Sequence, residues 1–403
     1  MTSIVDRNSR LTVAFTLDWQ GATARHRERL FAEKVSVWRD LFPGTMAEQL
    51  LGRQVGDTVS VAVTKEMFYA PSSPRLLRRI RPAQFAPPPG HRRRVDSPLY
   101  GRFYPQYCLQ GVPGVFQVST APCRFLGKEG DELLFSLDHP LAGRDLTLSA
   151  TIVDIDAIRV ERGGRCEAWL EAICDNGPGM QERLPARATD FFHGRPFMRR
   201  DEGDDRRFYH MPRMVQHLDS CALTLISAEY GRLLPRGADI LDLMGSWDSH
   251  LPADLEVGSL TVLGMNEEEL AKNRRATRTV VHDLNEQPTL PFADASCDAV
   301  INTAAIEYAA DPQRLCQEMA RVLRPGGVVA IAFSNRWFES KAIALWAQLH
   351  EFERLGLVVE LLHGSGLFRD IATLSVRGYP RPEEDPHPLP QADPVFLVSA
   401  RKD

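Results

Sequence analysis

The sequence predicts two domains of different fold class, an α+β domain followed by a doubly wound α/β domain. Residues 1–158 contain short segments in which apolar residues alternate strictly, together with one convincing helix, a pattern typical of an antiparallel sheet. From residue 238 onward, short and nearly continuous apolar strands alternate with helices, which indicates a parallel sheet covered on both faces. With 403 residues, 43% hydrophobic and 25% charged, the chain is long enough for two or three domains with cores of their own.

The composition argues against several classes of protein. No apolar run reaches the ~18 residues of a membrane-spanning helix, and residues 1–10 lack the apolar core of a signal peptide, so we expect a cytoplasmic protein without a membrane partner. Seven cysteines without a CxxC pair argue against a disulfide framework and against a bound metal. The net charge of −5 predicts no nucleic-acid partner, although residues 75–82 and 91–94 form a local basic cluster.

Three strands and one helix define the first domain. Apolar residues alternate over residues 11–19, 59–63 and 146–152, which predicts three half-buried antiparallel strands. TMAEQLLG, residues 45–52, predicts a short helix that ends at Gly52. Together these elements indicate an α+β unit.

Three phrases of this domain resemble FKBP-type peptidyl-prolyl isomerases. FPGTMAEQLLGRQVGDTVSVAV, EMFYAP and DHPLAGRDLTLSATIVDI resemble, in order, the helix, the flap edge and the final strand of that family, and are closest to its SlyD branch. The resemblance covers about residues 10–158. It implies an FKBP-like domain over 1–158, in which residues 72–137 form a flap insert that holds unfolded polypeptide.

The resemblance also implies a prolyl isomerase pocket. Such a pocket needs apolar and aromatic side chains that desolvate the X-Pro amide. By their place in the phrases, the matching residues are Leu41, Phe42, Tyr69 and Leu148. Two interpretations stay open, because these residues could equally be the apolar core of a barrel-like sheet. A chaperone-like or substrate-presenting domain fits both.

Residues 159–211 connect the two domains and are rich in aromatic residues. We interpret residues 187–217 as an arm that folds over a ligand pocket of the second domain, with a solvated spacer as the alternative. A helix is predicted to start at Met211 and Pro212. Its predicted buried stripe is Val215, Leu218, Ala222 and Leu225. Tyr209, Arg213 and His217 would share another face, and we expect Tyr209 and Arg213 to contact substrate.

The sequence predicts a doubly wound fold for the second domain, residues 212–403. The predicted strands are residues 238–243, 259–265, 279–284, 297–303, 326–334 and 356–362, and the predicted helices are residues 267–275, 311–323 and 339–355. In such a fold, the ligand binds beyond the carboxyl ends of the strands, where the strand order reverses.

Four phrases of this domain resemble class I methyltransferases that use S-adenosylmethionine. They are LDLMGSWDSH with Asp242 at a strand end, HDLNEQPTLPF with Asp283, LPFADASCDAVI, and RVLRPGG at residues 321–327. The resemblance implies S-adenosylmethionine as cofactor and methyl transfer as the reaction. The implied cofactor contacts are Asp242, Leu243, Met244, Gly245 and Ser246 in the first loop, Asn266 at the ribose position, and Asp283 and Leu284 after the third strand.

The first loop departs from the family's Asp-x-Gly-x-Gly-x-Gly turn. Met244, Ser246 and Asp248 stand at its three glycine positions, whereas Gly245 lies between them. Glycines there allow close approach of the backbone and positive φ. We therefore expect the cofactor to contact this loop through backbone amides.

Candidate substrate residues follow the fourth and fifth strands. Glu307 is the one carboxylate at the exit of the fourth strand and is our candidate base, with a helix-start acid as the alternative. Tyr308, Arg336 and Trp337 would form an aromatic and guanidinium edge for a planar or anionic substrate. The acceptor could be a small molecule or a peptide presented by the first domain.

Methyl transfer is the function that the sequence favours. One alternative is a folding helper, a weak prolyl isomerase or chaperone whose second domain is a scaffold without catalysis. The other is a binding module that senses the cofactor. Asp242 and Asp283 favour cofactor binding, whereas the absent glycines favour the scaffold.

Overall fold

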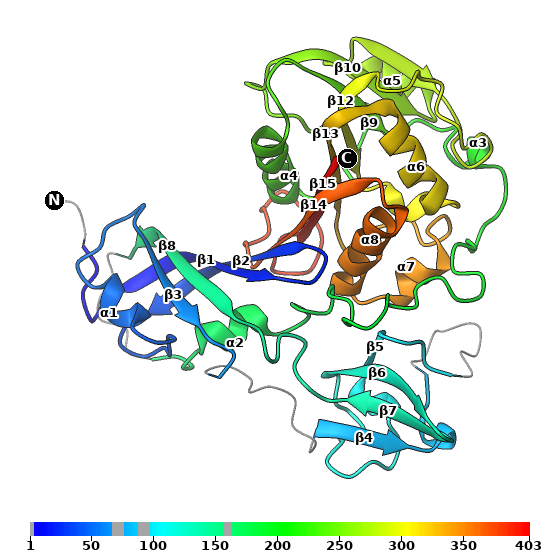
Figure 1. Cartoon of the computed structure of the whole chain (residues 1–403). Helices are drawn as coiled ribbons and strands as arrows, with labels where there is room; N and C mark the ends of the chain where they lie inside the picture. Colours follow the sequence, from blue (N-terminus) through cyan, green and yellow to red (C-terminus); the bar gives the residue numbers. More distant parts are fainter. Residues whose placement is uncertain (1–3, 67–75, 88–96, 157–162) are drawn as a thin grey trace. The chain divides into compact units, whose positions relative to one another are not determined.

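The computed structural model describes residues 4–66, 76–87, 97–156 and 163–403 (Figure 1). The chain divides into two compact units, an N-terminal unit up to His193 and a C-terminal unit from Gly194. Within these ranges, no helix combines the length and the hydrophobicity that a bilayer crossing needs.

The N-terminal unit is built on a four-stranded antiparallel sheet in the order β2-β1-β8-β3. Its strands are β1 (Arg10–Gln20), β2 (Arg25–Ser36), β3 (Thr58–Val63) and β8 (Leu146–Ile155). Three of them are the strands predicted from alternation. In β1 every second side chain from Leu11 to Trp19 is buried, because period-2 alternation directs those side chains to one face of the sheet.

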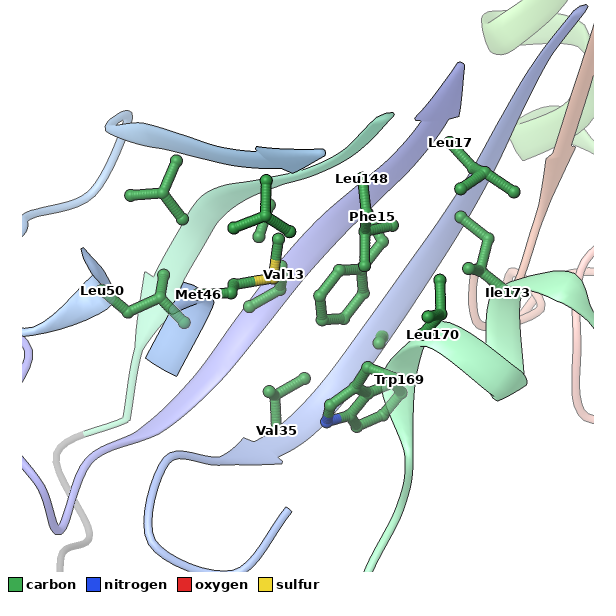
Figure 2. Packing of buried hydrophobic residues seen from close by; sticks show 14 of the residues in the cluster. Val13, Phe15, Leu17, Val35, Met46, Leu50, Leu148, Trp169, Leu170 and Ile173 are labelled. Carbon is green, nitrogen blue, oxygen red and sulfur yellow. The ribbon is translucent and has the colours of Figure 1, made fainter. Parts of the chain in front are cut away.

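Two short helices, α1 (Met46–Leu50) and α2 (Trp169–Cys174), pack against the buried face of this sheet (Figure 2). The Trp169 ring stacks on Phe15, with ring centroids 5.2 Å apart, and its Nε1–H donates to Asp40 Oδ2 over 3.1 Å. The backbone of Leu41 exchanges hydrogen bonds with Glu167 and Trp169. A helix from the predicted connecting segment therefore completes the core of this unit.

The residues expected to form an isomerase pocket have different surroundings. Leu148 is fully buried in the sheet core, and Phe42 packs against its margin, whereas Leu41 is 62% exposed. Tyr69 lies outside the described residues. The three described side chains thus form no common apolar surface, and α2 covers the sheet face instead. The FKBP resemblance of this unit stays a prediction.

Strand β2 was not predicted, because its buried face carries charged and polar residues. His26 and Glu28 both point into the unit and are less than 3% exposed. His26 Nε2 lies 3.2 Å from Glu182 Oε2, and Gln181 Nε2 donates to Glu28 Oε1 over 2.7 Å. These partners lie more than 150 residues away in the chain, so no local pattern indicates that the strand is half-buried.

The segment predicted as an insert forms a second antiparallel sheet with a core of its own. The sheet has the order β4-β7-β6-β5. Its elements are β4 (Leu77–Ile80), η2 (Pro82–Gln84), β5 (Phe103–Pro105), η3 (Gln106–Cys108), β6 (Pro122–Glu129) and β7 (Glu132–Ser136). Phe85, Tyr104 and Phe125 pack around Phe135 in the centre of this core.

The C-terminal unit has the doubly wound, Rossmann-like sheet that the sequence predicts. The strand order is β11-β10-β9-β12-β13-β15-β14, parallel from β11 to β13, with β15 antiparallel to both neighbours. The strands are β9 (Ala238–Leu243), β10 (Val257–Gly264), β11 (Arg278–Val281), β12 (Cys297–Thr303), β13 (Leu323–Phe333), β14 (Phe368–Arg377) and β15 (Val395–Lys402). The strand order reverses between β9 and β12, which is where such folds bind ligands.

Helices cover both faces of this sheet (Figure 1). The helices of this unit are α3 (Asp205–Phe208), α4 (Ser220–Leu233), α5 (Glu267–Lys272), η4 (Ile306–Tyr308), α6 (Pro312–Val322), α7 (Ala344–Gln348) and α8 (Glu351–Ser365). Helix α4 buries Ala222, Ile226 and Tyr230 against one face. On the other face Phe333 of β13 packs edge-on against Trp346 of α7.

Two predictions of secondary structure in this unit were wrong. The apolar run 356–362 is not a strand but the buried middle of α8, which begins at a capping box of His350 and Glu353. A run that is buried on all sides shows neither helical nor strand periodicity, so its pattern is ambiguous. The helix predicted from Met211 begins only at Ser220, and Val215 of its expected buried stripe is 57% exposed.

We expect Trp169→Ala to destabilise the N-terminal unit by about 3–5 kcal/mol, the usual cost of removing a large buried aromatic side chain. Trp38→Ala is the matched control, because Trp38 is 44% exposed and its loss should change stability by no more than about 0.5 kcal/mol. Urea denaturation of the full chain measures both. Equal effects of the two substitutions would show that α2 is not part of this core.

Candidate active site

A cavity lies at the point where the strand order of the C-terminal sheet reverses. Its walls are the loops that follow β9, β10, β11 and β12, together with residues 209–218, which precede α4. Parallel strands bring their carboxyl ends to one edge of the sheet, so loops far apart in the sequence meet here. This cavity is therefore our candidate active site.

The loop after β9 keeps the shape of a glycine turn although it has only one glycine. Met244 has φ +61°, the left-handed conformation that glycine adopts readily and that costs other residues about 1–2 kcal/mol. The Gly245 N–H donates to Leu263 O over 2.8 Å. A Cβ atom on Gly245 would lie 2.4 Å from Asp242 Oδ2, so no larger residue fits at this position.

Strained backbone recurs around the cavity. His250 has φ +54° and Ala304 has φ +49°, and both line the cavity together with Met244. Non-glycine residues in this region of φ persist only where the surroundings enforce them, and they concentrate at functional sites. The strain thus points to this cavity independently of any sequence motif.

Asp242 is a buried carboxylate on the cavity wall. It is 2% exposed, and its Oδ2 has no hydrogen-bond partner among the described residues. Burial raises the pKa of Asp242 to about 6, although a hydrogen bond from the Ser249 side chain opposes the shift. A buried carboxylate oxygen without a partner is costly unless a ligand satisfies it. The site therefore fits a ligand that carries positive charge or donors, as S-adenosylmethionine does.

Asn266, expected at the ribose position, is engaged by other parts of the chain. Its Oδ1 caps α5 by accepting from Glu269 N over 3.1 Å. Its Nδ2 donates to the carbonyl oxygens of Tyr209 and His210 over 2.9 and 3.0 Å. Asn266 thus ties the segment before α4 to the end of β10.

Glu269 is a cavity residue that the sequence did not indicate. Its Oε1 accepts from Arg213 N over 2.6 Å, and its Oε2 accepts from Ser246 Oγ over 2.5 Å. This one side chain joins the loop after β9 to the segment before α4. The only local signal is an acidic first turn of α5, which many exposed helices share.

The arm predicted over 187–217 divides between the units. Phe191 is buried in the N-terminal unit, with the Arg102 guanidinium 5.5 Å from its ring centroid. Residues 194–217, here named the distal arm, belong to the C-terminal unit. Phe208 and Tyr209 of the distal arm pack edge-on against each other, and Tyr209 lines the cavity.

Buried charges fasten the distal arm. Lys341 is fully buried, and its Nζ lies 2.9 Å from Asp205 Oδ1 and 3.0 Å from Asp201 Oδ2. Asp205 Oδ2 also accepts from Arg199 Nη1 over 2.6 Å and from Asn285 Nδ2 over 2.9 Å. Removing one member of such a buried network leaves an uncompensated charge and is strongly destabilising.

Arg213 of the distal arm lies among aromatic rings. Its guanidinium carbon is 4.7 Å from the ring centroid of Phe208, 5.8 Å from that of Tyr209 and 5.3 Å from that of Phe338. Tyr308 completes this wall, because its hydroxyl oxygen accepts from Phe338 N over 2.9 Å. The sequence placed Tyr209, Arg213 and Tyr308 at the substrate, and all three line the cavity.

The remaining expected cofactor contacts differ in position. Asp283 lines the cavity, and its Oδ1 accepts the N–H groups of Asn285 and Glu286 over 2.9 and 3.2 Å. Leu284 also lines the cavity. Leu243 is fully buried beneath it, and its carbonyl oxygen accepts from Asn302 Nδ2 over 2.9 Å.

Three residues expected at the substrate lie outside the cavity wall. Arg336 pairs with Asp393 and Asp385, with N···O distances of 2.9 and 3.2 Å. The Trp337 ring lies 4.2 Å from the guanidinium carbon of Arg354. Glu307 is 1% exposed, and burial raises its pKa to about 7. None of the three is among the residues that line the cavity, and their roles at a substrate stay predictions.

A cluster of three carboxylates elsewhere in this unit is a structural network. Asp219, Asp385 and Asp393 place their ligand atoms within 4.8 Å of one another. Arg336 and Arg381 bind this cluster, and the Asp219 side chain caps α4 by accepting from Ala222 N. The two guanidinium groups balance two of the three negative charges of this cluster.

Comparison with known proteins matches this unit to one family. Residues 248–331 match the family described as a methyltransferase domain. An uncharacterized methyltransferase of Mycobacterium sp. (strain JLS) is 44% identical over 46 residues, which are 11% of this chain and 18% of the relative. A Mycolicibacterium smegmatis protein, named "Probable S-adenosylmethionine-dependent methyltransferase", is 47% identical over 47 residues, 12% of this chain and 18% of the relative. The matched stretch thus spans less than a fifth of these relatives.

Solved methyltransferase structures also align with about half of the chain. An S-adenosylmethionine-dependent methyltransferase of Aquifex aeolicus shares 15% identity, with a TM-score of 0.31, over 50% of this chain and 99% of the other. One from Mesorhizobium loti shares 18% identity, with a TM-score of 0.30, over 43% and 96% of the two chains. The C-terminal unit thus combines a match to the methyltransferase domain family over residues 248–331 with a doubly wound sheet.

Proposed function

We propose that the C-terminal unit binds S-adenosylmethionine in this cavity and methylates an acceptor that enters beside the distal arm. The Asp242 carboxylate, buried with one oxygen unpartnered at the switch point of the sheet, is the observation that carries the proposal. The residues that would hold the cofactor are Asp242, the backbone of Met244 to Ser246, Asp283 and Leu284. The bound cofactor supplies an electrophilic methyl group on a positively charged sulfur.

The protein's own part in this reaction is positioning and the exclusion of water. Methyl transfer is an in-line displacement, so holding the reacting groups in one geometry accounts for most of the acceleration. Tyr209, Tyr308 and Phe338 line the cavity and shield it from solvent. Buried charges and Asn266 keep the distal arm in place over this site.

His217 replaces Glu307 as our candidate proton acceptor. Three histidines line the cavity, but His250 pairs with Asp248 and His282 lies 2.8 Å from Gln287 O. Burial and the nearby Arg213 lower the pKa of His217, so its imidazole is neutral at pH 7 and can accept a proton.

For the N-terminal unit we propose a role in binding or presenting a polypeptide. Phe116 and Val118 are 74% and 87% exposed in the loop before β6, and exposed apolar side chains suit contact with an unfolded chain. The same proposal includes an FKBP-like fold and prolyl isomerase activity. Proline-limited refolding of a test protein measures that activity. We also propose a cytoplasmic location, because all seven cysteines are free.

Two other functions remain testable against methyl transfer. A folding helper with an inactive second domain would bind neither S-adenosylmethionine nor S-adenosylhomocysteine. A cofactor sensor would bind both without turnover. Retained Asp242 and the strained loop after β9 favour binding, since a scaffold without a ligand has no need of either.

We expect Asp242 to contribute to the affinity for the cofactor. Asp242→Asn should weaken binding of S-adenosylmethionine by tenfold or more, because a charge-assisted contact is lost, on the order of 1.5–3 kcal/mol. Asp239→Asn is the control on the same strand, where Asp239 pairs with Arg324 outside the cavity. Calorimetry with S-adenosylmethionine and S-adenosylhomocysteine measures both variants. Absence of binding by the parent protein at millimolar ligand would favour the folding helper.

The stability of the protein should depend on pH through Asp242 and Glu307. Burial raises the pKa of Asp242 from 3.8 to about 6 and that of Glu307 from 4.5 to about 7. Each folded-state pKa exceeds the unfolded value, so each group lowers the free energy of unfolding as the pH rises through this window. The cost is absent near pH 4 and complete above about pH 7–8.

Asp242→Asn and Glu307→Gln should therefore each stabilise the protein without ligand at pH 8, by at most about 3 kcal/mol, and change little at pH 4. Only Asp242→Asn should also impair cofactor binding, because Glu307 does not line the cavity. Thermal denaturation from pH 4 to pH 8 measures the effect. A stability difference that does not vary with pH would contradict the assignment.

Substitutions of Asn266 should separate its role in holding the distal arm from a role at the cofactor ribose. Asn266→Asp keeps the cap acceptor of α5 but removes both donors to the distal arm, so we expect hydrogen exchange at residues 209–213 to rise about tenfold and cofactor binding to weaken. Asn266→Ser, which also keeps an acceptor but adds no charge, should loosen the distal arm similarly. Tighter cofactor binding by Asn266→Asp would assign Asn266 to the ribose instead.

A further inference from the structure

Several arginines of the C-terminal unit pair with a carboxylate, whereas Arg213, like Arg275 and Arg354, has no such pair among the described residues. Arg199, Arg336 and Arg381 each pair with at least one carboxylate. For Arg213, no ion pair exists within the part of the chain that the structure describes. Its Nη2 donates to Phe208 O over 3.0 Å, and the rest of the guanidinium lies over aromatic rings. A cation on a cavity wall thus retains unused donors.

The carboxylate that contacts the Arg213 backbone has its own hydrogen bonds. Glu269 uses one oxygen for the backbone N–H of Arg213 and the other for the Ser246 hydroxyl. Glu269 keeps its negative charge in these contacts, but among the described residues no carboxylate forms an ion pair with the guanidinium of Arg213. An anionic ligand would satisfy it.

Charge is distributed unevenly around the cavity. Asp242 lies near the end of β9, and Asp248 and Asp283 lie on the loops after β9 and β11. The guanidinium of Arg213 lies on the distal arm beside Phe338, and Glu269 lies between the two sides, bonded to Ser246 and to the Arg213 backbone. Opposite charges at two sides of one cavity favour a cationic ligand near the loops and an anionic one near the arm. The sulfonium-bearing cofactor matches the acidic side.

We infer that the methyl acceptor is a small planar aromatic anion, such as a hydroxylated aromatic carboxylate, whose anionic group pairs with the guanidinium of Arg213. The planar guanidinium binds a carboxylate through two parallel hydrogen bonds. Tyr209, Tyr308 and Phe338 provide ring faces and edges beside it, which favour an aromatic ligand. This inference rests on the proposed function and adds the substrate class to it.

The reaction on such an acceptor is balanced without a further reagent. The hydroxyl oxygen of the acceptor forms a bond to the methyl carbon of the cofactor. The bond between that carbon and sulfur breaks, and its electron pair remains on sulfur. The hydroxyl proton passes to the imidazole of His217, which lines the same wall with its ring centroid 5.0 Å from that of Phe338.

The test is calorimetry on the full chain saturated with S-adenosylhomocysteine, with salicylate as the probe. Salicylamide is the neutral planar control, and cyclohexanecarboxylate is the anionic control without an aromatic ring. We expect salicylate to bind about tenfold more tightly than either, the effect of one charge-assisted contact or of lost ring packing.

Variants of the arm then test the residue itself. Arg213→Gln should weaken salicylate binding about tenfold and abolish the preference over salicylamide, whereas Arg213→Lys should give an intermediate affinity because it keeps charge without the planar fork. Arg207→Gln is the matched control, since Arg207 is an exposed cation of α3 that does not line the cavity. Retained binding of S-adenosylhomocysteine shows that each variant is folded.

Several outcomes would overturn the inference. Equal salicylate affinity in the parent and in Arg213→Gln would remove Arg213 from the acceptor site. Competition between salicylate and S-adenosylhomocysteine would assign the guanidinium to the cofactor's own carboxylate. Failure of S-adenosylhomocysteine to bind at all would refute the proposed function, and titration of the cofactor-free protein with salicylate would still decide the role of Arg213.

Discussion

The buried ion pair between Lys341 and Asp205 is the interaction on which the candidate site depends. Both side chains are almost entirely buried, so their attraction must offset the loss of hydration of two charges. Arg199 and Asn285 supply the further hydrogen bonds that make such burial tolerable. Because Asp205 lies four residues before Tyr209, this network sets the course of the chain that brings Tyr209 and Arg213 to the cavity.

The cavity itself is formed at a cost in stability. Met244 holds a conformation that glycine would adopt without strain, and Asp242 is ionised in a place where burial disfavours its charge. In a scaffold that binds no ligand, either feature would lower the stability of the fold, and no ligand contact would compensate for it. Their coincidence at one loop, with Gly245 packed against the same carboxylate, is the pattern of a site maintained for a ligand.

The chemistry of the C-terminal unit is divided between the sheet and the distal arm. The loops after β9 and β11 supply acidic groups, whereas the arm supplies a cation and aromatic rings. Glu269 contacts both parts, so a change on one side can reach the other through a single side chain. Binding of a cofactor at the loop after β9 would therefore affect binding of an acceptor at the distal arm, through the contacts of Glu269 as well as through charge.

The sequence by itself determined the doubly wound sheet, the position of its ligand edge and the acids Asp242 and Asp283 at that edge. Those features depend on continuous apolar strands, on a carboxylate at a strand end and on a Pro-Gly-Gly sequence shortly after a helix, and such local patterns are visible in the linear sequence. Only the tertiary structure decided which side chains share the cavity. Glu307 and Arg336 follow strands that reach the edge, but Glu307 is buried away from the cavity and Arg336 pairs with aspartates, whereas Glu269 and His217 line the cavity.

The same distinction applies to β2 and α8. The buried face of β2 contains His26 and Glu28, whose partners are more than 150 residues distant, and most of α8 is buried on all sides because other elements surround it. Burial and polar partners are properties of the assembled chain, since they depend on residues brought together by folding. For that reason periodicity could assign the strands whose buried face is apolar. It could not assign β2, whose buried face carries polar residues, or α8, which is buried on all sides in its middle.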